Sequence, residues 1–169
     1  MQEDIPIKPL PTRYERLRQF WKNARELVET VLLAVLLYLV INLATSRIQV
    51  QSVSMQPTLY ERDRVLVNRL KYRFDPPQRQ EIIVFMPPLE HVKEPYIKRV
   101  IGLPEDTVRI AGGQVYVNGE ALEEGYLRAA PDYGGEWQVP PGSLFVLGDN
   151  RNLSSDSHFW GTVPLANVI

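Results

Sequence analysis

"LVETVLLAVLLYLVINLATS", residues 27–46, is the stretch that divides this chain of 169 residues into two parts. Glu29 is its only charged residue, and Val31 to Ile41 is unbroken apolar sequence. Twenty residues of α-helix cover about 30 Å, which is the thickness of the hydrocarbon core of a bilayer. The stretch therefore predicts one transmembrane helix, with a different kind of structure on each side of it.

Basic residues are concentrated before this stretch and predict its orientation. Only Arg47 follows it closely, whereas its N-terminal flank carries Arg13, Arg16, Arg18, Lys22 and Arg25. By the positive-inside tendency, residues 1–26 form a cytoplasmic tail and juxtamembrane helix, and residues 47–169 lie across the membrane. The first twelve residues contain three prolines and are predicted to be a disordered tail.

Two other interpretations of residues 27–46 are open. A buried core helix is one, because the unbroken apolar run is shorter than the roughly 18 residues typical of a span. A cleaved signal peptide is the other, because "ATS" at 44–46 offers small residues at a suitable spacing. The 26 residues before the stretch are long for the start of a signal peptide and favour a retained anchor.

Composition excludes several classes of function. The net charge of -1 and the isoelectric point near 6.1 give no basic field for nucleic acid. The chain has no cysteine, which removes disulfides, thiol catalysis and zinc–thiolate sites. With two histidines and no surrounding cluster of carboxylates, no metal site and no cofactor are predicted, and no feature indicates an oligomeric state.

After residue 47 the sequence changes to short β-rich runs separated by Pro and Gly. Asn118-Gly119 is a strong signal for a two-residue hairpin turn. The predicted fold is mainly β, an antiparallel domain behind one membrane helix. The candidate strands are "RIQVQ", "RVLVNRL", "EIIVFM", "YIKRVIG", "TVRI", "QVYV" and "SLFVLG".

The turn "QSVSMQPTL", residues 51–59, contains a candidate nucleophile, Ser54. A serine hydroxyl attacks an amide only when a base takes its proton. His158 could be that base, since it follows Asp156 by two residues and the pair would share one side of a strand. Lys98 is the other candidate, because it lies in the apolar strand "YIKRVIG" and burial favours a neutral lysine. From these residues alone the choice stays open.

Several segments make the chain similar to a known family. "SVSMQPTL" resembles the serine box of type I signal peptidases, the membrane-bound Ser/Lys proteases that remove leader peptides. "DRVLVNRL" and "EIIVFMPP" resemble the segments that follow it, "YIKRVIGLPED" the lysine box and "LGDNRNLSSDSHFWGTVP" the final box. The segments occur in family order after a membrane span, and they cover most of residues 47–165.

The resemblance implies a role for each matching residue. Ser54 would be the nucleophile and Lys98 the general base. Ser52 would offer its hydroxyl, beside the backbone N–H of Ser54, to the oxyanion. Ser154 would hydrogen-bond and orient the lysine. Structural support of the site would come from Asp149, Arg151 and Asp156. The family's small accessory β-subdomain would occupy residues 107–144.

The resemblance also implies the substrate. The family cuts after small side chains, typically alanine, at positions −1 and −3 of signal peptides of exported preproteins, on the periplasmic or thylakoid-lumen side of a lipid bilayer. Shallow apolar pockets would select these side chains by steric exclusion, and the leader would add to the edge of "RIQVQ" as an extended strand. The pocket candidates are Ile48, Val50, Leu59, Tyr96 and Ile97.

This sequence departs from the family pattern at several positions. Gln80-Glu81 stands where the family often has Gly-Asp, and Glu105 stands where it usually has glycine. Leu153 replaces a common asparagine, and His158 replaces a common arginine. Histidine at that position resembles the cyanobacterial and thylakoid members of the family.

Two other functions remain as alternatives. A self-cleaving repressor of the LexA type shares the Ser/Lys chemistry and a β-rich domain, but it should carry a DNA-binding helix-turn-helix in place of the anchor. A non-catalytic, membrane-anchored β-domain that binds secreted partners would leave a preprotein uncut.

Overall fold

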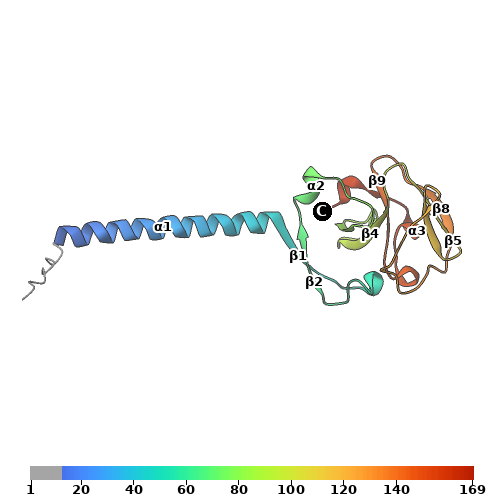
Figure 1. Ribbon diagram of the computed structural model, residues 1–169, viewed down its shortest axis with the longest axis horizontal. Coiled ribbons are helices and arrows are strands. Elements are labelled where there is room, and N and C mark those ends of the chain that lie inside the picture. Colours follow the sequence, from blue (N-terminus) through green and yellow to red (C-terminus); the bar gives the residue numbers. More distant parts are fainter. Residues whose placement is uncertain (1–12) are drawn as a thin grey trace, which may run out of the picture. The chain divides into compact units, whose positions relative to one another are not determined.

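The computed structural model describes residues 13–169, so the predicted disordered tail lies outside the described residues. The chain divides into two compact units, and the boundary falls between Leu43 and Ala44. The first unit contains the N-terminal helix, and the second, Ala44–Ile169, contains every strand of the described chain (Figure 1).

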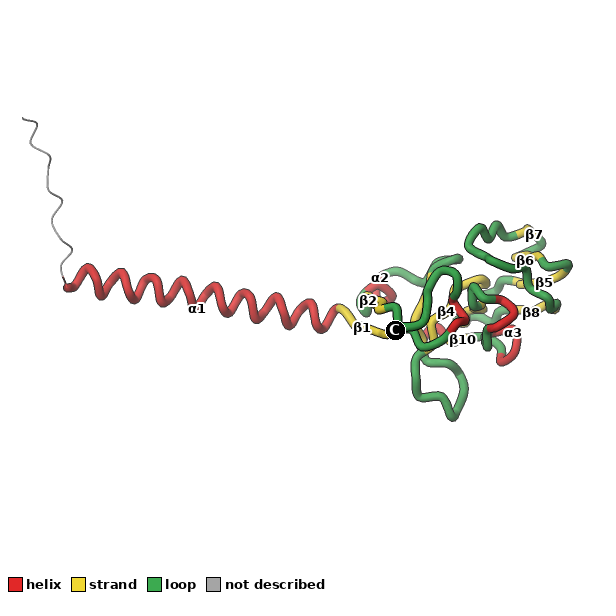
Figure 2. Tube along the Cα trace, turned by 90° about the horizontal axis from the view of Figure 1, so that it is seen from below, coloured by secondary structure: helices red, strands yellow, loops and turns green. Residues whose placement is uncertain are grey.

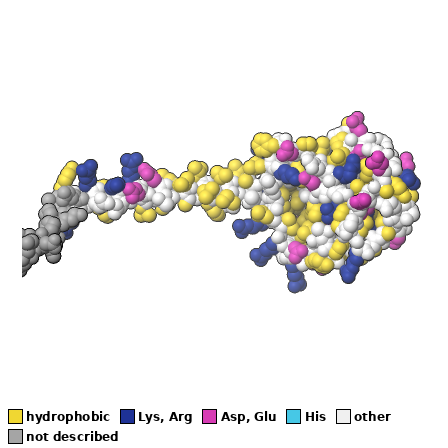
Figure 3. Space-filling view, viewed as in Figure 1, with side chains coloured by type: hydrophobic (Ala, Val, Ile, Leu, Met, Phe, Trp, Pro, Cys, Tyr) yellow, Lys and Arg dark blue, Asp and Glu magenta, His cyan; other side chains and the backbone are white. Residues whose placement is uncertain are grey.

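The helix α1, Arg13–Ala44, is continuous from the predicted juxtamembrane segment through the predicted span. Its charged side chains gather in its N-terminal half, and apolar side chains cover the rest (Figure 3). It is the one helix in residues 13–169 that is long and apolar enough to cross a membrane, and none of its most apolar window is buried by protein. This exposure argues against the buried core helix. The helix ends at Ala44, two residues before the end of the predicted segment.

A two-stranded antiparallel sheet follows α1 directly. Its strands are β1, Thr45–Gln49, and β2, Arg64–Asn68, and Thr45 pairs with Asn68. Between them the chain makes a 3-10 turn, η1, at Val53–Met55, and after them a short helix, α2, at Lys71–Phe74. The hairpin thus carries the turn that contains Ser54.

The second unit contains a four-stranded antiparallel sheet in the order β10-β9-β4-β3. Two of its strands, β4 and β10, are labelled near the middle of this unit in Figure 2. Its strands are β3, Ile82–Phe85; β4, Tyr96–Gly102; β9, Ser143–Leu147; and β10, Val163–Pro164. Strand β4 lies between β3 and β9, so both of its edges are paired. One face of this sheet packs into an apolar cluster that includes Phe85, Val100 and Val146.

A second four-stranded sheet, in the order β7-β6-β5-β8, coincides with the predicted accessory subdomain. Its strands are β5, Thr107–Ala111; β6, Gln114–Val117; β7, Glu120–Ala121; and β8, Gly135–Gln138. Its apolar side chains share one cluster with Ile101 of β4 and with Phe145 and Leu147 of β9. The accessory sheet therefore packs against the central sheet and belongs to the same compact unit.

The predicted class, a mainly antiparallel β fold with one N-terminal apolar helix, is confirmed. Each of the seven predicted runs contains a strand, although "RIQVQ" is displaced, since β1 starts at Thr45 and ends at Gln49. Asn118 and Gly119 form the predicted hairpin turn, with φ of 53° and 86°. The strands β7, β8 and β10 were not predicted, because they are short and lack an alternating apolar pattern.

Gln80 and Glu105 stand where glycine is expected from the resemblance, and both have the left-handed backbone conformation that favours glycine. Gln80 has a φ of 69° and Glu105 a φ of 71°. The left-handed region costs a residue with a Cβ about 1–2 kcal/mol. The backbone N–H of Glu105 donates to the carbonyl of Val139, and that of Gln80 donates to the carbonyl of Val100. Tertiary hydrogen bonds therefore hold these turns without glycine.

Replacement of Glu105 by glycine is expected to stabilise the fold. The side chain of Glu105 is exposed, and glycine adopts a φ of 71° without steric cost. The free energy of unfolding of Glu105→Gly should rise by about 0.5–1 kcal/mol, after allowance for the greater freedom of glycine in the unfolded chain. Thermal unfolding in detergent measures the difference. Glu90→Gly is the control, because Glu90 lies at an exposed turn with negative φ, and this variant should have a lower free energy of unfolding. Equal losses of stability in both variants would contradict the proposed backbone strain at Glu105.

Candidate active site

Ser54 lies in η1, where its position is fixed by the loop that follows β9. The side chain is buried, with a relative exposure of 6%. Its carbonyl accepts a hydrogen bond from the backbone N–H of Asn150, 2.9 Å away, and the side chain of Asn150 donates to the carbonyl of Val53. One distant segment, the loop after β9, thus holds the serine turn in place through Asn150.

Lys98 lies at the middle of β4, opposite Ile83 of β3. The side chain is 4% exposed, and its Nζ is 2.6 Å from Oγ of Ser54. The ring of Tyr96 lies on the same side of the strand, with its centroid 5.5 Å from Nζ. The predicted alternation, with Tyr96, Lys98 and Val100 on one face of the strand, agrees with these contacts.

Burial lowers the pKa of Lys98 from 10.5 to about 8, and the negative charges of Asp156 and Asp149 partly oppose this shift. An ordinary lysine is neutral in well under about 1% of molecules at pH 8, whereas a lysine with this pKa is neutral in about half of them. A neutral amine 2.6 Å from a hydroxyl can accept its proton. The pair can therefore generate a nucleophilic serine near neutral pH.

Ser52 and Ser154 surround this pair in different ways. Oγ of Ser52 is 3.1 Å from Oγ of Ser54, so the two hydroxyls lie side by side, and the oxyanion role of Ser52 stays a prediction. Ser154 is buried, but within the described residues its Oγ has no hydrogen-bond partner. The predicted hydrogen bond from Ser154 to Lys98 is thus not formed here, and its role stays a prediction.

Gly148 lets these serines approach each other. A Cβ at Gly148 would lie 2.2 Å from Oγ of Ser154 and 2.5 Å from the carbonyl oxygen of Ser54. Both distances are far below van der Waals contact, so only glycine fits between the two segments. The close packing explains why a glycine follows the last residue of β9.

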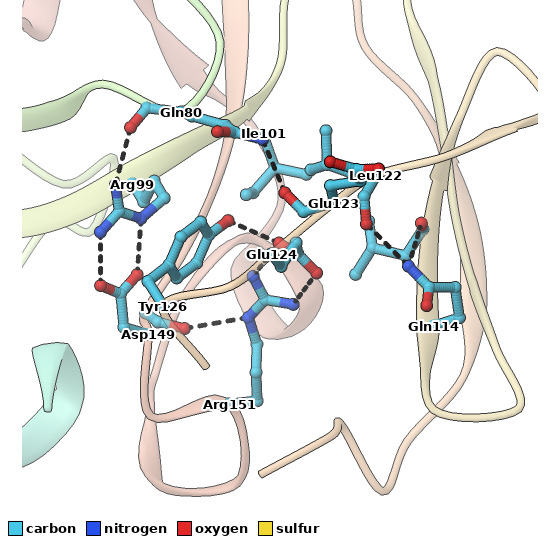
Figure 4. Close-up of polar contacts among 12 residues, drawn as sticks. Gln80, Arg99, Ile101, Gln114, Leu122, Glu123, Glu124, Tyr126, Asp149 and Arg151 are labelled. Carbon is cyan, nitrogen blue, oxygen red and sulfur yellow. Dashed lines mark hydrogen bonds and ion pairs between the residues drawn. The ribbon is translucent and has the colours of Figure 1, made fainter. Parts of the chain in front are cut away.

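An arginine–carboxylate pair braces β4 on its other face. Arg99 donates to both oxygens of Asp149, over 2.8 Å and 2.6 Å, and its guanidinium lies 3.8 Å from the ring centroid of Tyr126 (Figure 4). The hydroxyl of Thr58 also donates to Asp149. The predicted supporting role of Asp149 thus has a concrete basis: it ties the serine turn to the lysine strand.

A second pair joins the final loop to the accessory sheet. Arg151 donates to both carboxylate oxygens of Glu124, over 3.0 Å and 2.5 Å, and its Nε donates to the carbonyl of Gly148 (Figure 4). The hydroxyl of Tyr126 also donates to Glu124. Arg151 was predicted as a support, but Glu124 and Tyr126 were missed. No sequence pattern marks these two residues. Once Arg151 is known to be buried, a carboxylate partner is expected, because a buried arginine requires one.

His158 lies in a different environment from the one that its spacing predicts. Asp156 is the N-cap of a short helix, α3, Ser157–Trp160, so the predicted shared strand is wrong. The two residues still meet, because Nδ1 of His158 is 2.5 Å from Oδ1 of Asp156. The ring of His158 stacks on Tyr133, while the hydroxyl of Ser54 contacts Lys98 and Ser52. The geometry therefore favours Lys98 as the base.

A groove of about 580 Å³ opens onto Ser54 and Lys98. Ile48, Val50, Tyr96 and Ile97 line it and Leu59 does not, and the assignment of these residues to substrate pockets stays a prediction. Leu59 lies after the serine turn, where its backbone N–H donates to the carbonyl of Met55. Residues that sequence reasoning did not assign to the groove also line it: Gln49, Gln51, Val53, Met55, Glu94, Pro95, Leu153 and Ser155.

Comparison with known proteins gives consistent matches. Residues 24–169 match the model of the family described as signal peptidase, peptidase S26. A signal peptidase I of Leptolyngbya laminosa is 48% identical over 153 residues, covering 84% of this chain and 74% of that protein. A chloroplastic thylakoidal processing peptidase of Arabidopsis thaliana is 38% identical over 71% of this chain and 38% of its own length. A crystal structure of a signal peptidase I from Enterococcus faecalis, 35% identical, matches with a TM-score of 0.50 over 56% of this chain and 94% of that one.

The burial of Lys98 is expected to destabilise the fold below pH 8. Below about pH 8 the lysine is protonated in the folded and unfolded states, so the folded state bears the full penalty of about 3 kcal/mol. Between pH 8 and pH 10.5 the unfolded state binds more protons, and stability rises with pH. Lys98→Met should therefore be about 1–3 kcal/mol more stable than the wild type at pH 6.5, with a smaller gap at pH 9.5.

Thermal unfolding of the full chain in detergent at both pH values measures this gap. Lys93→Met is the matched control, because Lys93 is exposed and its replacement should not change the pH dependence. A methionine variant that is less stable than the wild type at both pH values would contradict the expected penalty.

Proposed function

The chain belongs to the signal peptidase family, peptidase S26, and we propose that it cleaves signal peptides with Ser54 as nucleophile and Lys98 as general base. Membership of the family makes it a serine endopeptidase of the type I signal peptidase class. One observation supports the assignment of the dyad more than any other: a buried lysine with Nζ 2.6 Å from the hydroxyl of Ser54.

Acylation begins when neutral Lys98 takes the proton of Ser54 as Oγ attacks the scissile carbonyl. The negative charge that develops on the carbonyl oxygen requires hydrogen-bond donors. The hydroxyl of Ser52 and the backbone N–H of Ser54 serve as these donors. The ammonium of Lys98 then gives its proton to the departing amine, and the carbonyl carbon stays bound to Oγ of Ser54.

Deacylation reuses the same base. A water molecule attacks the acyl-enzyme, Lys98 takes a proton from that water, and the proton passes to Oγ of Ser54 when the ester bond breaks. The products are the released signal peptide, which ends in a new carboxylate, and the mature protein, which begins with a new amine. No other catalytic group is needed for the proton balance.

The substrate lies in the groove as an extended strand. Residues 48–50 and residues 94–97 line the groove. Strand β1 pairs with β2 along one of its edges, in a sheet of two strands. Backbone hydrogen bonds from a strand of the leader would fix its register, and shallow apolar walls would exclude large side chains at positions −1 and −3. Ile48, Val50, Tyr96 and Ile97 are the proposed pocket residues.

The apolar helix makes this a membrane-anchored enzyme, and its sidedness is part of the proposal. The excess of basic residues before the span supports a cytoplasmic N-terminus, and the catalytic unit then lies on the periplasmic or thylakoid-lumen side. Its partners there are exported preproteins and the lipid bilayer.

Loss of either member of the dyad is expected to abolish cleavage. Ser54→Ala removes the nucleophile and Lys98→Ala removes the base, and each should lower the rate by at least about 10³-fold. His158→Gln should stay within about tenfold of the wild type at pH 8.5. The assay is cleavage of a preprotein with an Ala-x-Ala leader in detergent, with Lys93→Ala as the control.

Each alternative function has its own outcome in this assay. A loss in His158→Gln with retained activity in Lys98→Ala would favour a histidine mechanism. Binding of an uncut preprotein by the wild type would indicate a non-catalytic module. Cleavage of the chain itself with no cleavage of the preprotein would indicate a self-cleaving protein.

Ser52→Ala should lower kcat by about 10²–10³-fold with little change in KM, because an oxyanion donor acts mainly in the transition state. Ser52→Thr keeps a hydroxyl and should retain part of the activity. Ser155→Ala is the control, since this exposed serine lines the same groove. An effect of Ser52→Ala on KM alone would contradict the assignment.

A further inference from the structure

The groove that opens onto Ser54 has two residues of a charged type in its lining, Glu94 and Lys98. Lys98 is 4% exposed and its amine contacts Ser54, so it is not available to bind a charged group of a substrate. Glu94 is exposed, and the other lining residues of the described chain are uncharged. The groove therefore presents a single solvent-facing charge, and that charge is negative.

The carboxylate of Glu94 has neither a hydrogen-bond partner nor an ion-pair partner within the part of the chain that the structure describes. The acidic residues that brace the dyad differ, because each is paired with an arginine whose charge is permanent. Asp149 pairs with Arg99. Glu124 pairs with Arg151. Those carboxylates connect segments of the fold, whereas the carboxylate of Glu94 is free to bind a group that enters the groove.

The free edge of β4 leads from the dyad toward Glu94. Pairing between β4 and β9 begins at Arg99, so Tyr96–Lys98 pair only with β3 in the described chain. Pro95 follows Glu94 directly and favours an extended conformation for the residue before it. A leader strand placed along this edge can thus run from Lys98 past Tyr96 to Glu94.

We propose that Glu94 is a specificity-determining residue that binds a basic side chain at position −5 of the leader, the fifth residue before the cut, and disfavours an acidic one there. The inference rests on the proposed function, because that function places the scissile carbonyl at Ser54 and the leader in the groove. It adds a preference for charge to the steric selection proposed at positions −1 and −3.

The position −5 follows from the spacing of extended chains. Glu94, Tyr96 and Lys98 occupy alternate positions, and all three line the groove. Side chains at −1, −3 and −5 of a leader strand also share one face, and the strand advances about 3.3 Å per residue. With −1 opposite Lys98, position −3 lies opposite Tyr96 and −5 opposite Glu94, up to about 13 Å along the strand from the dyad. Positions −2 and −4 point to the other face.

The expected preference is modest, because the ion pair forms near solvent. Exposed ion pairs typically change an equilibrium constant by about 1.5- to 5-fold, and salt screens them. A contact that is equally strong in the bound substrate and in the transition state changes KM and leaves kcat unchanged. A basic residue at −5 should therefore lower KM about threefold relative to glutamine, and an acidic residue should raise it by a similar factor.

The experiment measures kcat and KM for three preproteins with an Ala-x-Ala leader that differ only in having Lys, Gln or Glu at −5. The full chain is assayed at pH 8.5 and low salt in an uncharged detergent, as the wild type, Glu94→Gln and Glu94→Lys. The wild type should have the lowest KM for the Lys leader and the highest KM for the Glu leader. Glu94→Gln should remove this order, and Glu94→Lys should reverse it.

Three controls separate a contact in the groove from the general charge of the enzyme. Glu90→Lys makes the same change of charge in the same loop, but Glu90 is exposed and does not line the groove, so this variant should keep the wild-type order. The same three residues placed at −2, which points to the other face, should change KM less than they do at −5. A high salt concentration should reduce the preference of the wild type.

Equal KM values for the three leaders in the wild type would overturn this inference, and so would an equal change of preference in Glu90→Lys and Glu94→Lys. Cleavage of the leaders by the wild type would in either case leave the proposed function intact. A wild type that cleaves none of the three leaders would overturn the proposed function and this inference with it.

Discussion

The proposed mechanism depends on keeping the amine of Lys98 without its proton next to the hydroxyl of Ser54. Lys98 meets this requirement because its side chain is buried against the central sheet, with 4% exposure. The resulting loss of solvation lowers its pKa to about 8. This arrangement costs about 3 kcal/mol of stability near neutral pH, a large share of the roughly 5–15 kcal/mol typical of a domain. The apolar clusters on both faces of the central sheet offset that cost.

The charged residues around the dyad contribute alignment more than net stability. A buried ion pair gains little over a well-packed apolar pair, but the loss of one partner is strongly destabilising. Arg99–Asp149 connects the lysine strand to the final loop, and Arg151–Glu124 connects that loop to the accessory sheet. Because both pairs are bidentate, they set orientation as well as distance. The accessory sheet thereby helps to hold the loop whose Asn150 supports the serine turn.

Local patterns in the sequence predicted the long apolar helix, the main strands and the Asn118-Gly119 turn, because each depends on neighbours along the chain. The site required more, since Ser54 and Lys98 lie 44 positions apart and only the order of family segments linked them. Three predictions came from alignment or spacing alone: a pocket position for Leu59, a strand containing His158, and a hydrogen bond from Ser154 to Lys98. Neither alignment nor spacing reveals where a turn directs a side chain. Glu124 was missed because an isolated acidic run normally indicates a solvated surface; its role appears only when the fold brings it to Arg151.

Anchoring in a membrane can compensate for a groove that binds the leader with low affinity. Recognition of two small side chains contributes little affinity, because one methyl-sized group in an apolar pocket is worth about 1–3 kcal/mol. In the proposed binding mode, a main-chain strand of the leader added to β1 would supply the remaining affinity within the groove. If the enzyme and its substrate are both bound to one bilayer, this shared binding raises the local concentration of the cleavage segment. Its binding in the groove is then effectively intramolecular. Weak contacts in the groove are then sufficient, and the cleaved leader can leave it readily.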